Sequence, residues 1–225
     1  MPSYRPGLPS FPPVIKTLII VNAIVYFGQR TIPDLTEWGA LHYWKSPLFK
    51  PHQIITHMFM HDPQSILHIL FNMLVLWMFG AILENYWGAK RFINFYMICG
   101  IGAAIAQMVM IPWEVTRAVH AAYPPELWDE AIQFQLEHFS MMGASGAIMG
   151  VMAAFAYLFP NTELLIFLVP IPVKAKYLIP IYVLIDIFGG ISGGDNVAHF
   201  AHLGGALVGI LLVIFQNRNN RRNFY

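Results

Sequence analysis

The sequence predicts an all-α membrane protein with six transmembrane helices. Of its 225 residues, 57% are hydrophobic and 11% are charged, whereas about 25% of residues are charged in a soluble domain. The apolar residues gather in runs long enough to form all or most of a membrane-spanning helix. The fifth run is the shortest and ends at Gly189-Gly190, so we expect it to pack most loosely. The six runs are 13–27, 66–83, 92–111, 141–159, 177–188 and 197–215.

Lysine and arginine predict that both termini face the cytoplasm. With the N-terminus inside, nine of the 13 basic residues fall on the cytoplasmic side and four on the outer side, as expected for a membrane protein whose inner loops are basic. No soluble domain or repeat interrupts the runs. We therefore expect one membrane domain over residues 1–225, with a cytoplasmic segment at 1–12 and a basic cytoplasmic tail at 216–225.

Composition also limits the partners. The net charge is +1 and no basic stripe runs between the spans, so we expect the lipid bilayer and no nucleic acid as a partner. Cys99 is the single cysteine and lies inside the third run, which rules out a disulfide framework. The sequence does not define the oligomeric state.

A serine stands between glycines at the outer end of the fourth run. The segment reads Gly143-Ala144-Ser145-Gly146. Glycine weakens a helix, so its presence indicates a close backbone approach or exposed backbone N–H groups. Two interpretations are open for Ser145: a nucleophile inside the membrane, or part of a small-residue packing face of the kind common in membrane helices.

Histidines precede and begin the second run. His57 and His61 are four residues apart, as are His68 and Asn72, so each pair shares a helix face. Polar side chains in a span are costly and indicate function. They could also be interfacial anchors or half of a metal site. Because a metal site needs three or four ligands, and no carboxylate or cysteine lies at matching depth, we expect neither a metal nor a cofactor.

The second, fourth and sixth spans all run from the outer face inward, and their polar residues fall at one depth. His68 and Asn72 lie in the first turns of the second span, Ser145 about four residues into the fourth, and His202 about five into the sixth. At 1.5 Å per residue these side chains lie roughly 5–10 Å below the outer surface. Unrelated packing residues would scatter in depth, so the pattern favours one shared site.

Glycine ridges predict how the fourth and sixth spans meet. Gly146 and Gly150 are four residues apart, and so are Gly205 and Gly209. Small residues at this spacing let two helices approach closely. A hydrogen bond from Ser145 to His202 is then sterically reasonable, which is the nucleophile and base arrangement of a serine hydrolase.

Three donors are candidates for the oxyanion hole: the backbone N–H of Ser145 and the side chains of His68 and Asn72. No acid stands at an obvious position behind His202, so we expect a dyad. We interpret Asp186 as a solvated carboxylate near the outer rim, with a proton-handling role as the alternative.

Two other polar residues have expected structural roles. We interpret Glu84 as a partner of the basic turn that follows the second span, and Gln107 as a packing hydrogen bond. His199 is either an orienting neighbour of His202 or a solvated surface histidine.

Together these residues resemble the rhomboid intramembrane serine proteases. Each motif alone is weak, but their order along the spans is specific, and they cover nearly the whole membrane core. The resemblance implies Ser145 as nucleophile, His202 as general base, and His68 and Asn72 as oxyanion-hole residues, in an enzyme that cleaves transmembrane substrates near the outer face. The motifs are His57-Met-Phe-Met-His61, His68-Ile-Leu-Phe-Asn72, Glu84, Gly143-Ala-Ser-Gly146, and Ala201-His202 with Gly205 and Gly209.

Two positions depart from the family pattern. Some bacterial members carry Trp-Arg where this chain has His52-Gln53, and many place an aromatic residue where this chain has Met149. A thioether packs on imidazole less rigidly than an aromatic ring, which bears on the rate rather than on the type of reaction.

The predicted function is hydrolysis of a peptide bond in or beside a substrate's transmembrane helix. We expect a multi-pass protein of the bacterial inner membrane. Water would enter through an outer polar cluster formed by His57, His61 and the loop before His199, and substrate beside the loose fifth span. The alternatives are a catalytically silent client-binding membrane protein and a small transporter or metal-handling protein, the latter suggested by nine histidines.

Overall fold

The computed structural model describes residues 11–166, 169–192 and 197–221. Residues 1–10 of the predicted N-terminal segment, residues 167–168 and 193–196, and residues 222–225 of the predicted basic tail lie outside the described residues.

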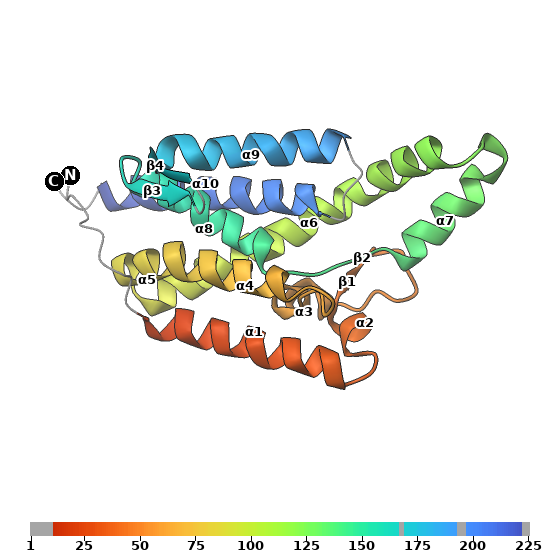
Figure 1. Cartoon of the computed structure of the whole chain (residues 1–225), viewed down its shortest axis with the longest axis horizontal. Helices are drawn as coiled ribbons and strands as arrows, with labels where there is room; N and C mark the ends of the chain where they lie inside the picture. Colours follow the sequence, from red (N-terminus) through yellow and green to blue (C-terminus); the bar gives the residue numbers. More distant parts are fainter. Residues whose placement is uncertain (1–10, 167–168, 193–196, 222–225) are drawn as a thin grey trace.

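Long helices of alternating direction form the body of the molecule. In Figure 1, α1, α6 and α9 run one way, and α4–α5, α8 and α10 run the other. Helix α1 begins and α10 ends at one end of the bundle, and α8 begins toward the opposite end, which we call the Ser145 end. The helices are α1 (Pro13–Thr31), α4 (Ile66–Val75), α5 (Ala81–Trp87), α6 (Ala89–Ala122), α8 (Ser145–Leu158), α9 (Ala175–Ser192) and α10 (His199–Arg221).

Apolar length identifies the chain as a multi-pass membrane protein. Among the described residues, four helical segments are long and apolar enough to cross a bilayer, and α8 is a shorter apolar helix. Large apolar side chains such as Val109, Phe188 and Phe215 are about 70% exposed, as expected for surfaces that face lipid. The six-span count and the orientation of the termini remain predictions. The four segments are Ile66–Trp87, Ala89–Ala122, Ala175–Ser192 and His199–Asn217.

The third predicted span is longer in the structure than the sequence indicated. We expected it to end at Ile111, before Pro112, but α6 continues through this proline to Ala122. A proline removes one backbone hydrogen bond from a helix. Here the second half of α6 is held by packing, because Val115 and Val119 are buried against side chains of α7 (Trp128–His138). Figure 1 shows this pair extending beyond the other helices.

Short elements close the Ser145 end. Helices α2 (Leu35–Gly39) and α3 (Gln53–Thr56) precede α4, and β1 (Leu41–His42) pairs antiparallel with β2 (Ser140–Met141), directly before α8. The buried Gln53 side chain accepts hydrogen bonds from the Lys50 and His42 backbone N–H groups and donates to the Leu48 carbonyl.

The opposite end contains a hairpin and a helix cap that the sequence did not reveal. Strands β3 (Glu163–Ile166) and β4 (Val169–Lys174) pair antiparallel between α8 and α9. Glu84 was expected to pair with the basic turn, and this is wrong. Its side chain is buried, and its two carboxylate oxygens accept hydrogen bonds from the Val14 and Ile15 N–H groups at 2.9 and 2.8 Å. A carboxylate at the N-terminus of α1 satisfies two N–H groups that lack intrahelical partners.

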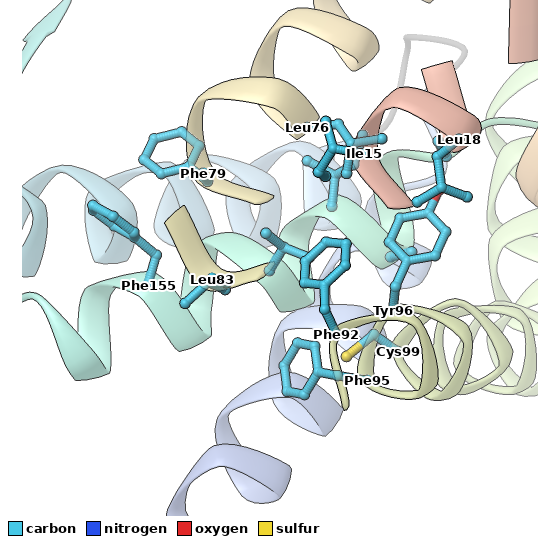
Figure 2. Close-up of a cluster of buried hydrophobic side chains, with 14 of the residues drawn as sticks. Ile15, Leu18, Leu76, Phe79, Leu83, Phe92, Phe95, Tyr96, Cys99 and Phe155 are labelled. Atoms are coloured by element: carbon cyan, nitrogen blue, oxygen red, sulfur yellow. The ribbon is translucent and has the colours of Figure 1, made fainter. Parts of the chain in front are cut away.

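The main apolar core joins α1, α4–α5, α6 and α8. A π-helical turn, Leu76–Gly80, links α4 to α5 and directs Leu76 and Phe79 inward. Figure 2 shows Leu76 and Phe79 in one cluster with Phe92 and Tyr96 of α6 and Phe155 of α8. Helix α9 contributes little to this core, since its buried apolar members there are Ala175 and Ile179. It lies along α10 at the edge of the bundle (Figure 1).

Candidate active site

Ser145 is the first residue of α8, whereas the predicted span began four residues earlier, at residue 141. The chain enters the helix through Gly143, whose φ of 136° is strained for any residue with a side chain. The Gly143 N–H donates to the His57 carbonyl at 2.9 Å, which fixes this entry. The Ser145 N–H is therefore one of the unpaired donors at a helix N-terminus.

Helices α8 and α10 cross in backbone contact at four of the predicted glycines. A Cβ at Gly205 would collide with the carbonyl oxygen of Gly146, and a Cβ at Gly209 would lie 2.5 Å from the Cα and the carbonyl oxygen of Gly150. No larger residue fits there without separating the two helices. This approach brings the start of α8 next to the first turn of α10.

The Ser145 hydroxyl and the His202 imidazole meet across this interface. His202 Nε2 lies 2.8 Å from Ser145 Oγ, within ordinary hydrogen-bond range. His202 is 8% exposed and Ser145 is half-buried. The hydrogen bond that the two inward-running spans predicted is thus present in the structure.

A carboxylate lies behind the histidine, contrary to the expectation from the sequence. Asp186 of α9 was interpreted as solvated, but it is 4% exposed. Its Oδ1 lies 3.0 Å from His202 Nδ1 and 2.8 Å from His199 Nδ1. His199 is 7% exposed, so the solvated-histidine alternative is wrong as well.

Two further contacts hold α9 at this position. Gly189 of α9 faces the His199 ring so closely that an added Cβ would overlap it. The Arg117 guanidinium of α6 donates to the Gly190 carbonyl at 3.0 Å and lies over the Trp113 ring.

The two side chains predicted for the oxyanion hole, His68 and Asn72, differ in how they relate to Ser145. The Asp62 N–H donates to His68 Nδ1 at 3.2 Å, so the neutral ring carries its proton on Nε2. This Nε2 and Ser145 Oγ border the open face of Gly143, at 3.2 and 3.5 Å from where a Cβ would stand. Asn72 donates to the His68 carbonyl at 2.8 Å, so its described hydrogen bond supports the His68 turn.

Gln107 positions the first turn of α10. Its Oε1 accepts from the Ala201 N–H at 3.0 Å, and its Nε2 donates to Glu114 Oε2 at 2.5 Å. The prediction of a packing hydrogen bond is confirmed. Glu114 was missed because it lies after Pro112, beyond the predicted end of the third span at Ile111, whereas α6 continues and places it two turns after Gln107.

The two histidines of the predicted outer polar cluster are buried. His57 is 2% exposed and His61 is 0% exposed, so the interpretation of these rings as a water-facing entry is wrong. Burial lowers the pKa of His57 to about 4. Burial, and then the neighbouring His68, lowers the pKa of His61 to about 4. Both rings are neutral near pH 7, and the His61 ring packs edge-on against His68.

The positions that depart from the family pattern have local roles. His52 stacks on Trp38 with ring centroids 4.2 Å apart, while Gln53 organises the loop before α4. Met149 is buried with Ala206 of α10, and Val183 of α9 packs against this cluster. Over the described residues, no group of three or more histidine, cysteine or acidic side chains is arranged to hold a metal ion.

Fold and site define a helical membrane protein with a serine, a histidine and a carboxylate in hydrogen-bonded sequence near one end of its bundle. The rhomboid domain family matches residues 49–219, which is most of the chain. The protein belongs to the rhomboid family.

Similar proteins occur in mitochondria and in bacteria. The chain is 34% identical over 202 residues to the mitochondrial Rhomboid protein 1 of Saccharomyces cerevisiae, covering 88% of this chain and 51% of the yeast protein. It is 29% identical over 204 residues to the mitochondrial presenilin-associated rhomboid-like protein of Mus musculus, covering 89% and 48%. It is 31% identical over 229 residues to Rhomboid protease AarA of Providencia stuartii, covering 88% and 70%.

The chain therefore spans about half the length of these mitochondrial relatives. Because the relatives include both mitochondrial and bacterial proteins, the bacterial inner membrane remains a prediction for this chain.

Proposed function

We propose that the protein is an intramembrane serine endopeptidase that uses Ser145 as nucleophile and His202 as general base. The observation that carries the proposal is the 2.8 Å distance between Ser145 Oγ and His202 Nε2 in a bundle of apolar helices. Membership of the rhomboid family and the name of the bacterial relative, a rhomboid protease, support it.

The reaction follows from this pair. Ser145 Oγ attacks the carbonyl carbon of the scissile peptide while His202 Nε2 takes the hydroxyl proton. The tetrahedral intermediate collapses, the carbon–nitrogen bond breaks, and His202 returns the proton to the leaving amine. Water then adds to the acyl-enzyme with His202 again as base, which releases the acid product and restores Ser145.

The oxyanion of the intermediate is stabilised by the Ser145 backbone N–H and by His68 Nε2–H. The first is a free donor at the N-terminus of α8, where the helix dipole also favours negative charge. The second borders the open face of Gly143 beside the hydroxyl. Asn72 acts with them, and its hydrogen bond to the His68 carbonyl keeps that turn in place.

Substrates of this enzyme are transmembrane helices that unwind near the outer face. Helix α9 has 22% of its apolar stretch buried, against 44% for each of the other long apolar segments. A substrate helix that enters beside α9 therefore has to displace the fewest packing contacts. We also propose a six-span topology with both termini in the cytoplasm, in which the Ser145 end faces outside; the distribution of basic residues supports it.

The test is cleavage of a reconstituted single-span substrate in liposomes, with the products mapped by mass spectrometry. Wild type is expected to cut in or beside the span, and Ser145→Ala and His202→Ala to reduce the rate at least about 1,000-fold. Thr17→Ala, on the exposed side of α1, is the matched control and keeps the wild-type rate. Full cleavage by Ser145→Ala would contradict the proposal and favour the catalytically silent client-binding alternative.

A further inference from the structure

We propose that Asp186 is a positioning residue for His202, and that the general base is competent only while α9 is docked on α10. This inference rests on the proposed function of Ser145 and His202. It extends that function, because it makes a residue of the most weakly packed long helix part of the catalytic arrangement.

The first step concerns the proton on the imidazole. An ionised carboxylate accepts hydrogen bonds but donates none. With Asp186 Oδ1 3.0 Å from His202 Nδ1, the ring proton resides on Nδ1. Nε2 then presents its lone pair to the Ser145 hydroxyl at 2.8 Å. Only this tautomer can take the serine proton.

The second step concerns charge. Proton transfer from Ser145 turns His202 into an imidazolium in a buried site, where an isolated cation is costly. The carboxylate of Asp186, 4% exposed, lies next to that charge. Its Oδ1 is shared with His199 Nδ1 at 2.8 Å, so His199 helps to fix the carboxylate while leaving the serine side of His202 open.

The third step concerns the helix that brings the carboxylate. Helix α9 contributes little to the main core, and 22% of its apolar stretch is buried. Its contacts around Asp186 include Gly189 against the His199 ring and the Arg117 hydrogen bond to the Gly190 carbonyl. Val183 also packs against the small cluster that contains Met149 and Ala206. If α9 moves away from α10, it removes the carboxylate from His202. Lateral displacement of α9 therefore switches off the base while leaving the α8–α10 interface unchanged.

The experiment compares Asp186→Asn, Asp186→Glu and wild type in two assays. One is the rate at which a small fluorophosphonate acylates Ser145, and the other is kcat and KM on a single-span substrate. Asp186→Asn is expected to lower both kcat and the acylation rate about 100-fold, with KM changed less than about twofold, because the wrong tautomer becomes accessible. Asp186→Glu keeps a carboxylate and recovers part of the rate.

A double-mutant cycle tests the coupling to α9. Gly189→Ala pushes α9 off the His199 ring and is expected to slow acylation about 10-fold in wild type, but less than about twofold in the Asp186→Asn background. Ile185→Ala, beside Asp186 but 60% exposed, is the matched control and leaves the rate unchanged.

The outcomes separate this inference from the proposed function. Wild-type acylation by Asp186→Asn, or a Gly189→Ala effect of equal size in both backgrounds, would overturn the inference and leave the Ser145–His202 reaction standing. If Asp186→Asn does not fold, wild-type acylation by folded Gly189→Ala overturns the inference. Cleavage by Ser145→Ala would instead overturn the proposed function itself.

Discussion

Helix α10 has two interfaces of opposite character. Against α8 it packs backbone on backbone, with glycines on both helices and no space for a Cβ at Gly205. Against α9 the interface includes a buried polar cluster, in which Asp186 meets His199 and His202, and an apolar contact of Val183 with the cluster that contains Ala206. At its glycine crossings the first interface leaves no space for a side chain, whereas the helix of the second interface, α9, contributes only Ala175 and Ile179 to the main apolar core.

The contrast explains how one small bundle combines a fixed and a movable part. Nucleophile and base lie on the two helices that cannot move apart, so their 2.8 Å geometry is built into the fold. The carboxylate lies on the helix that can. The proposed entry of a substrate helix beside α9 requires such a division, because close-packed interiors respond to strain by switching between discrete arrangements.

The largest expected effect is at the glycine interface. Gly205→Val should reduce the free energy of unfolding by more than about 4 kcal/mol, because the new side chain meets the Gly146 carbonyl and the helices must part. Thermal unfolding in detergent measures this. The control is Gly28→Ala, where a Cβ meets only the flexible Leu35 side chain at 3.1 Å. Equal stability of the two variants would contradict the comparison.

A second pair of substitutions compares the two helices that flank α10. Phe155→Ala on α8 removes a ring that is 1% exposed and should cost about 3–5 kcal/mol. Phe188→Ala on α9 removes a ring that is 69% exposed and should change stability by less than about 0.5 kcal/mol. Denaturation of both proteins in one detergent gives the difference. A large loss from Phe188→Ala would show that α9 is packed as firmly as α8.

A pH titration tests the loop that anchors α8. The pKa values of His57 and His61 are about 4 in the folded protein and about 6.5 when unfolded. The unfolded chain therefore binds more protons between these values. The contribution of these two neutral histidines to the free energy of unfolding is complete above pH 6.5 and decreases as the pH falls toward 4. At pH 5 the loss is about 2 kcal/mol per histidine.

Unfolding free energies at pH 7 and pH 5 measure this loss. His61→Gln should reduce the loss by about 2 kcal/mol. A stability that does not change between the two pH values would contradict the burial of these rings.

The smallest effect is dynamic. Backbone amides of α9 should exchange with deuterated solvent about 10-fold faster than those of α8, which corresponds to an opening free energy lower by about 1.4 kcal/mol. Hydrogen exchange followed by mass spectrometry of peptides from both helices measures it. Equal protection would remove the distinction between a fixed and a movable interface.

The sequence predicted those parts of the site that depend on helix direction and spacing. Three inward-running spans gave His68, Ser145 and His202 a common depth, and the glycine ridges predicted which helices touch. Helix direction and residue spacing are local properties, so they can be read without coordinates.

Other features depend on rotation and long-range contact, which spacing does not encode. Asp186 faces α10 because of how α9 is rotated about its axis, and a short apolar run does not define that rotation. Glu84 caps a helix 69 residues away. Pro112 stays within α6 because α7 packs against the continued helix. Each correction involves a partner from a different element.

The most direct test of the central claim is intact-mass analysis after reaction with a fluorophosphonate in detergent. We expect one adduct, mapped to Ser145, in wild type, and an adduct that forms at least about 100-fold more slowly in His202→Ala. An adduct on another serine, or undiminished labelling of Ser145 in His202→Ala, would contradict a nucleophile activated by the histidine of α10.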